Sequence, residues 1–344
     1  MRWFAILVGT FCCTAGTAIA ADLTPLAVNA YPNAKALPLF AGIEKQIFAR
    51  HGLMLELKST DNAGEQRKGL AAGDYALIHI ALDNAIAMAD VARQDVVIVM
   101  GGDSGMNEFF VQPEIRSLAD LRGKSLVVDS PDTAYALLAK KILLKNGLRD
   151  GVDYTVKPVG RGELRLKAMA QSRDNAAAVL NLPYSVQAKQ MGLRSLGSTV
   201  DMLGPYQAGG VFAMRAWARA NGPLLERYLA AYIESLRWVL DKRNRAECVT
   251  LLMTKLRLDR DVAERSYDLL VDPAIGFTPD AKLDMEGFRN MLALRAEMQG
   301  AKGVAPAAPE RYIDLGYYEG AMKRLTAEKS RHAVDATTRG RDNR

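Results

Sequence analysis

The chain has 344 residues, of which 49% are hydrophobic and 24% charged, and its formal net charge is +6. This is the composition of a soluble globular protein that can bury a large core. The only dense basic stretch, the tail at 328–344, has no interleaved aromatic residues, so the sequence argues against a nucleic-acid partner.

The first twenty residues have the parts of an export signal. Arg2 supplies the positive start, and residues 4–11 form an apolar stretch that is too short to span a bilayer. Ala18-Ile19-Ala20 has the small-x-small pattern of a signal peptidase site. We therefore expect a signal peptide at 1–20, cleaved near Ala20, and a mature chain in the periplasm. No internal disulfide is expected, because Cys248 is the only cysteine after the signal.

From residue 24 onward, short apolar runs alternate with amphipathic patterns. The pattern predicts strands at 26–31, 53–58, 75–80 and 96–100, and helices at 36–50, 64–72 and 83–92. A glycine-rich break follows at 101–105. The alternation then resumes, with strands at 108–112, 125–129, 154–158, 176–181, 194–196 and 209–215 and helices at 132–146, 163–171 and 183–191. Residues 216–300 are almost entirely helical in pattern, and a last helix is expected at about 317–325, before a disordered basic tail at 326–344.

Two successive α/β units followed by a helical region predict an α/β protein with two lobes, each a mostly parallel sheet flanked by helices. Ligands of such sheets bind at the carboxyl ends of the strands, where helix N-termini present free N–H groups. We therefore expect one cleft between the lobes. At its edge Ser130 is predicted to cap the helix that follows, and its hydroxyl can also contact a ligand; the sequence leaves both roles open.

Four stretches resemble a known family. They are PLFAGIEKQIFARHGL at 38–53, GLAAGDYALI at 69–78, SLADLRGKSLVV at 117–128 and AAVLNLPY at 177–184. They are similar to segments of the nitrate/sulfonate/taurine-type periplasmic substrate-binding proteins of ABC importers, which are related to the yeast thiamine-pyrimidine synthases. The resemblance covers about residues 24–325.

The resemblance implies the two-lobed periplasmic binding protein fold of type 2, in which the chain crosses twice between the lobes. Lobe 1 would hold residues 21–104 and 208–325, and lobe 2 would hold residues 105–207. It also implies a monomer that closes on a small organic solute and docks on a membrane permease. Neither a cofactor nor a metal is expected, and no catalytic residue is predicted.

Carried over position by position, the resemblance also implies a set of ligand-binding residues in the loops after strands, with Gln207 at the return crossing between the lobes. They are Tyr31, Asn33, Leu37, Ser59, Thr60, Asn62, Ala81, Asp83, Asn84, Ser130, Thr133, Arg161, Asn181, Tyr184 and Gln207.

The charges near these loops bear on the class of solute. Arg161 is the one basic candidate, whereas carboxylates crowd the same strand ends: Asp83, Asp103, Glu108, Asp129, Asp132 and Glu163. An anion buried without a paired cation costs on the order of several kcal/mol. A neutral, aromatic or zwitterionic solute is therefore favoured over nitrate or sulfate, with Tyr31 and Tyr184 as stacking faces. An acid held by Arg161 and the helix after Ser130 stays open.

Two other functions remain as alternatives. One is an enzyme of the same fold, of the pyrimidine-precursor or menaquinone-pathway type. The export signal argues against it, and the chain lacks the cysteine-rich segment of the thiamine-pyrimidine synthases. The other is a ligand-sensing adaptor, which would use the same cleft as a transport protein and cannot be separated from one by sequence.

Overall fold

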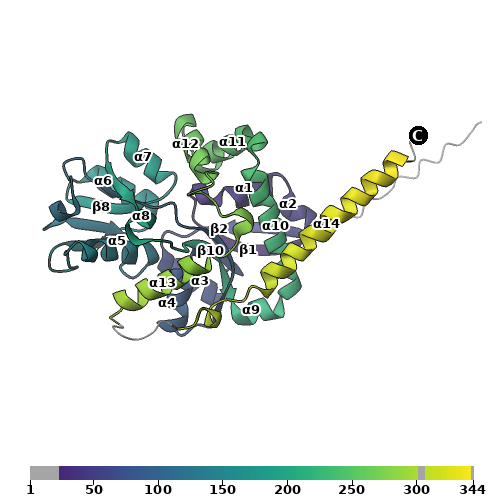
Figure 1. Ribbon diagram of the computed structural model, residues 1–344, viewed down its shortest axis with the longest axis horizontal. Helices are drawn as coiled ribbons and strands as arrows, with labels where there is room; N and C mark the ends of the chain where they lie inside the picture. The colour runs from purple at the N-terminus through teal and green to yellow at the C-terminus, as the bar shows by residue number, and fades with distance from the viewer. Residues whose placement is uncertain (1–22, 301–306, 342–344) are drawn as a thin grey trace, which may run out of the picture.

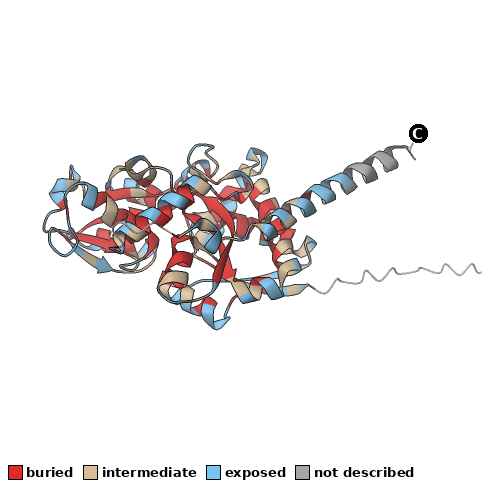
Figure 2. Cartoon of the chain, turned by 60° about the horizontal axis from the view of Figure 1, so that its bottom comes forward, coloured by how far each residue is buried: buried red, intermediate tan, exposed pale blue. Residues whose placement is uncertain are grey.

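The computed structural model describes residues 23–300 and 307–341. The predicted export signal at 1–20 lies outside the described residues. Within them the chain forms two lobes, which lie side by side in Figure 1. Figure 2 shows that the buried residues concentrate in the two sheets and on the inner faces of the helices around them.

The first lobe is built on a five-stranded sheet in the order β2-β1-β3-β10-β4. The strands are β1 (Thr24–Ala30), β2 (Leu53–Lys58), β3 (Leu77–Ala81), β4 (Val96–Asp103) and β10 (Gly209–Met214). β2 lies at an edge, and its residues alternate between inward and exposed positions. β4 lies at the other edge but is buried throughout, because Ile98 bridges to Ile313 in a later segment of the chain.

The second lobe is built on a five-stranded sheet in the order β7-β6-β8-β5-β9. The strands are β5 (Glu108–Val111), β6 (Ser125–Val128), β7 (Thr155–Pro158), β8 (Asn175–Leu180) and β9 (Arg194–Ser198). In each sheet one described strand runs antiparallel to its neighbours, β10 in the first and β5 in the second. The remaining strand pairings are parallel. The predicted fold class is therefore confirmed.

The chain passes between the sheets twice. It leaves the first sheet after β4, and it returns from β9 to β10. Every strand lies in the sheet to which the expected lobe boundaries assign it, and the boundaries at 105 and 208 themselves stay predictions.

Helices cover the sheets and extend the first lobe. The first lobe carries α1 (Leu37–Glu44), α2 (Ile47–Arg50), α3 (Ala63–Ala72) and α4 (Asp83–Asp90), and the second carries α5 (Ala134–Lys145), α6 (Gly162–Gln171), α7 (Tyr184–Gln190) and α8 (Thr199–Leu203). After β10 come α9 (Arg215–Ala220), α10 (Gly222–Leu240), α11 (Arg245–Leu256), α12 (Arg260–Leu270), α13 (Met285–Met298) and α14 (Gly316–Arg341). Short 3-10 helices lie at η1 (Ala34–Ala36), η2 (Leu118–Leu121), η3 (Lys242–Asn244), η4 (Pro279–Ala281) and η5 (Pro309–Arg311).

The structure corrects three predicted helix boundaries. The helix expected over 36–50 is broken at Gln46, whose φ of 54° is left-handed and cannot continue a helix. Helix α5 begins after Thr133, so Thr133 and not Ser130 is its N-terminal flanking residue. The tail expected to be disordered from 326 is instead helical to Arg341, as the last part of α14.

Helix α14 extends away from the body of the molecule in Figure 1. Its first turns are held by burial, since Ala321 and Leu325 belong to the core of the first lobe. The next residues, Thr326-Ala327-Glu328-Lys329, include three good helix formers and no glycine or proline, which favours continuation of the helix over disorder. Among the described helices, none has both the length and the apolar character needed to cross a bilayer.

Candidate functional site

A cavity lies between the two lobes, at the ends of the strands. It encloses about 940 Å³, with open solvent at its mouth included, and both lobes contribute to its wall. The carboxyl ends of β1, β3, β6 and β8 all lead into lining residues, because parallel strands present these ends at one edge of each sheet. The cavity therefore lies where the ligand cleft was predicted, between the lobes at the carboxyl ends of the strands.

Eight of the fifteen predicted binding positions line this cavity. In the first lobe these are Tyr31 and Asn33, which follow β1, Ala81, which ends β3, and Asn84, which lies in the first turn of α4. In the second lobe they are Thr133, Arg161, Asn181 and Tyr184, which follow β6, β7 and β8. Asn33 also begins η1, since its side-chain oxygen accepts a hydrogen bond from the N–H of Lys35 at 3.0 Å. Their contact with a solute stays a prediction.

Three predicted residues are buried elsewhere. Leu37 is fully buried in the core of the first lobe. Asp83 does not line the cavity, and it accepts a hydrogen bond from Nη1 of Arg295 at 2.6 Å. Gln207 stabilises the return crossing, because its Nε2 donates to the carbonyl of Gly209 at 2.7 Å and its Oε1 accepts from the N–H of Asp284 at 2.7 Å.

Four more predicted residues lie outside the cavity wall. Asn62 caps α3, since its Oδ1 accepts from the N–H of Glu65 at 2.9 Å. Thr60 donates weakly to the carbonyl of Asn62 at 3.5 Å, and Ser59 is exposed. The carbonyl of Ser130 accepts from the hydroxyl of Thr133 at 2.9 Å. These polar residues satisfy local turns and caps, which is the ordinary role of such residues after a strand.

Several residues that line the cavity were not predicted, and three of them affect the distribution of charge at its wall. Lys35 lies in η1, Tyr135 in the first turn of α5, and Arg165 one turn into α6. Arg165 could have been found from its spacing, because residues i and i+4 share a helix face and Arg161 lies four positions earlier. The expectation that Arg161 is the only basic residue near the site is therefore wrong.

Lys35 is held in a buried ion pair at the wall. Its Nζ lies 2.8 Å from Oδ1 of Asp103 and 3.3 Å from the hydroxyl of Tyr135. Burial alone would lower the pKa of Lys35, but the attraction of Asp103 more than reverses this effect and raises it, so the side chain stays charged. The second contact reaches across the cavity, because Lys35 belongs to the first lobe and Tyr135 to the second.

Two further groups on the first-lobe wall have pKa values that burial shifts. The hydroxyl of Tyr31 is buried and has no hydrogen-bond partner among the described residues, and burial raises its pKa well above the ordinary value, with a further contribution from the carboxylate of Asp129. His79 hydrogen-bonds through Nε2 to the hydroxyl of Tyr228. Burial lowers the pKa of His79 to about 3, so its ring is neutral at physiological pH.

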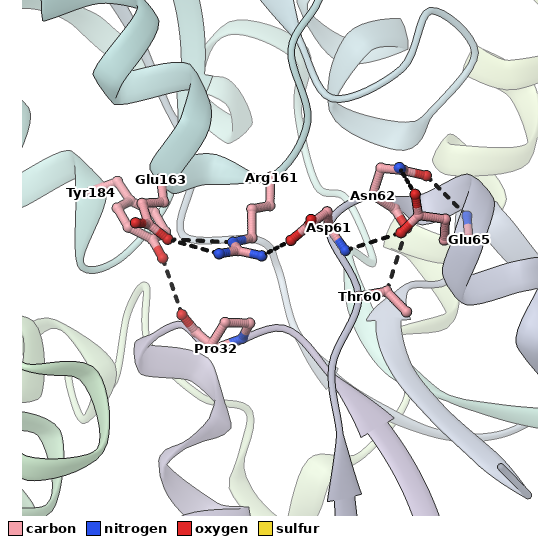
Figure 3. A network of polar contacts seen from close by, with 8 residues as sticks. All are labelled: Pro32, Thr60, Asp61, Asn62, Glu65, Arg161, Glu163 and Tyr184. Atoms are coloured by element: carbon pink, nitrogen blue, oxygen red, sulfur yellow. Dashed lines mark hydrogen bonds and ion pairs between the residues drawn. The ribbon is translucent and has the colours of Figure 1, made fainter. Parts of the chain in front are cut away.

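The two lobes touch beside the cavity, as Figure 3 shows. Arg161 of the second lobe forms an ion pair with Asp61 of the first, and its backbone N–H donates to the carbonyl of Asp61 at 3.0 Å. Arg161 also lies 3.1 Å from Glu163, so its charge is already neutralised. The hydroxyl of Tyr184 donates to the carbonyl of Pro32 at 3.0 Å, which is a second direct contact between the lobes.

Among the described residues, one group has the spacing to hold a cation, and it does not line the cavity. His51, Glu234 and Glu328 place one potential ligand atom each within 4.8 Å of one another. Glu234 is already engaged, because its carboxylate lies 2.6 Å from Arg50 and 2.7 Å from His51. A guanidinium paired with this carboxylate favours a structural ion pair over a metal ligand.

The family follows from the sequence itself. The model of the NMT1-like family matches residues 20–253, which is more than half of the chain. The chain belongs to the NMT1-like family. This match spans both sheets and every residue position predicted for the site. Among curated proteins, none matches this NMT1-like sequence significantly.

Solved structures with the same fold include known binding proteins. A protein from Bordetella bronchiseptica RB50 superposes with a TM-score of 0.73 at 17% identity, covering 89% of this chain and 99% of its own. The periplasmic nitrate-binding protein NrtA of Synechocystis PCC 6803 gives a TM-score of 0.70 at 14% identity, covering 89% and 90%. The alkanesulfonate-binding protein SsuA of Xanthomonas axonopodis pv. citri, bound to MOPS, gives 0.66 at 20% identity, covering 83% and 96%. The NMT1-like chain therefore has the periplasmic binding protein fold.

Proposed function

We propose that this NMT1-like protein is the periplasmic solute-binding component of an ABC importer and that it binds a small organic solute between its lobes. The observation that carries the proposal is the cavity, which is walled by both lobes and rich in hydrogen-bonding groups. Such concave sites with a few convergent polar groups are typical of small-molecule binding. The partner would be a membrane permease that receives the loaded, closed form.

Closure of the lobes on the solute is supported by the contacts beside the cavity. Tyr184 with Pro32, Lys35 with Tyr135 and Arg161 with Asp61 each join one lobe to the other. These contacts can form only when the lobes are close together. A solute that also touches both lobes would stabilise the same arrangement, which is how ligand binding shifts a hinge equilibrium.

Replacing Tyr184 with Phe tests this closure. The change removes the hydroxyl that donates to Pro32 and keeps the ring, so the closed form should lose about 1 kcal/mol, the typical net value of one hydrogen bond. We expect a larger radius of gyration by small-angle X-ray scattering without solute, and roughly fivefold weaker solute binding. Tyr154→Phe is the matched control, because Tyr154 lies in the core of the second lobe, and it should change neither quantity. An unchanged radius and affinity for Tyr184→Phe would contradict the closure.

A solute screen by thermal unfolding tests the function itself. At a concentration of 100 Kd, a solute that binds only the folded state should stabilise the protein by about 2.7 kcal/mol and raise Tm. Asn181→Leu, at the cavity wall, should abolish the shift and so place the solute in the cavity. If no organic solute raises Tm and none co-purifies in native mass spectrometry, the proposed function fails. Chemical turnover of a bound solute would instead favour an enzyme.

A further inference from the structure

Arg165 is a buried cation without a partner. It is 4% exposed, and its Nε is shut off from solvent with no hydrogen-bond partner. Among the described residues, no ion pair or side-chain hydrogen bond engages its guanidinium, which lies 6.0 Å from the centre of the Tyr135 ring. Both other cations of the cavity wall are neutralised, Lys35 by Asp103 and Arg161 by Asp61 and Glu163. Since an unpaired buried charge is costly, Arg165 is the cation that remains available to a solute.

Asp129 is the complementary anion of the same wall. It lines the cavity, and no ion pair joins it to another described residue; its one printed contact is a hydrogen bond accepted from the hydroxyl of Thr133. Asp103, the other carboxylate of the wall, is already paired with Lys35. Asp129 and Arg165 line the same cavity as Tyr31, whose hydroxyl is buried without a hydrogen-bond partner among the described residues. The cavity therefore presents one free positive and one free negative group close to a buried, protonated phenol.

This pattern selects against singly charged solutes. A simple anion attracted to Arg165 would be repelled by Asp129, and a simple cation attracted to Asp129 would be repelled by Arg165. A neutral apolar solute would displace water from both charges and leave them unpaired. A molecule that carries an acid and a basic nitrogen satisfies both groups with charge-assisted hydrogen bonds, which are stronger than those that a neutral polar solute can form.

We propose that the solute is a small zwitterion, whose carboxylate or sulfonate binds Arg165 and the hydroxyl of Tyr31 and whose protonated amine binds Asp129. This inference rests on the proposed function, since it names the class of solute for the same cavity. It assigns Arg165, in place of the predicted Arg161, as the residue that recognises the acid group. Arg161 holds the lobes together instead, one helical turn away.

Matched compounds test the proposal directly. Each set contains a zwitterion, the acid without its amine and the amine without its acid: taurine, ethanesulfonate and ethylamine; β-alanine, propionate and propylamine; phenylalanine, 3-phenylpropionate and phenethylamine. Titration calorimetry should show at least tenfold tighter binding of one zwitterion than of either of its partners. Native mass spectrometry of the protein as purified covers solutes outside these sets, and a retained solute should contain both an acid and an amine.

Variants assign the two halves of the solute. Arg165→Gln and Asp129→Asn should each weaken binding of the zwitterion by tenfold or more, and Arg165→Lys should restore part of the loss. Arg173→Gln is the control, because Arg173 is exposed in the same lobe and pairs with Glu114 at 3.1 Å. This variant should bind the zwitterion with the affinity of the wild type. Circular dichroism checks that each variant folds. If the Arg165→Gln variant does not fold, the affinity of the Arg165→Lys variant still tests the role of Arg165.

The outcomes separate the two proposals. A bound or retained solute that lacks an acid group, or an affinity unchanged in Arg165→Gln, overturns the zwitterion and leaves the solute-binding function intact. Tighter binding of the acid alone than of its zwitterion overturns the role of Asp129. The absence of any bound or retained solute overturns the solute-binding function, and the zwitterion with it.

Discussion

Replacing Asp83 with Asn is expected to lower the free energy of unfolding by about 3–5 kcal/mol, because it leaves a buried guanidinium without its counter-ion. The side chains of Asp83 and Arg295 are 1% and 2% exposed, and Nη1 of Arg295 lies 2.6 Å from Oδ2 of Asp83. The pair joins α4 to α13 in the first lobe. Burial raises the pKa of Asp83, and the charge of Arg295 opposes that rise. Urea unfolding at pH 7 measures the loss.

Two further variants show whether the effect comes from the unpaired charge. Asp261→Asn breaks an exposed pair with Arg265 on α12, where the atoms lie 2.9 Å apart, and it should cost about 0.5 kcal/mol or less. The double variant Asp83→Leu with Arg295→Met removes both charges and should recover most of the stability, as replacements of buried pairs often do. A cost below about 1 kcal/mol for Asp83→Asn would contradict this account of the pair.

Acid should destabilise the protein through His79, well above the pH at which carboxylates titrate. Burial lowers the pKa of His79 to about 3 in the folded state, whereas a histidine in the unfolded chain titrates at about 6.5. Between these values the unfolded state binds one more proton than the folded state, so stability falls as pH falls. The full stabilisation is present above about pH 6.5 and is lost at about 1.4 kcal/mol per pH unit below it.

His79→Gln isolates this contribution. Between pH 7 and pH 5 the wild type should lose about 2 kcal/mol more unfolding free energy than the variant, which has no titrating group at this position. Glutamine can still pair with the hydroxyl of Tyr228, the partner of the imidazole. The contributions of other titrating groups to the pH dependence cancel when the two proteins are compared. Equal losses in wild type and variant would mean that water reaches the ring and that it titrates normally.

The order of the elements and the place of the cavity could be predicted from the sequence. Apolar runs and 3.6-residue periodicities are local, so β1 to β10 and most helices lie where the pattern indicates, within a few residues. The cavity follows from the alternation of strands and helices, which places the carboxyl ends of the strands together. That is why Tyr31, Asn84, Thr133 and Asn181, each soon after a strand, line its wall.

The break at Gln46 and the helical course of residues 326–341 could not be predicted in this way. The first depends on packing around a left-handed residue, and the second on the anchoring of α14 through Ala321 and Leu325 in the core of the first lobe. In both cases the local sequence permits more than one conformation, and long-range contacts select one of them.

The sequence by itself determined which segments meet at the cavity, namely the loops after the strands, and only the tertiary structure decided which of the charges there are free. Arg161 and Arg165 lie four positions apart at the start of α6, and Arg161 has Glu163 two residues away as a local partner. Asp61, 100 residues before Arg161, neutralises the first and leaves the second unpaired. Likewise Asp103 is paired with Lys35, 68 residues earlier, whereas no described cation lies within ion-pair distance of Asp129. The charge that a buried site offers depends on contacts between distant segments, because electrostatic pairing acts through space and not along the chain.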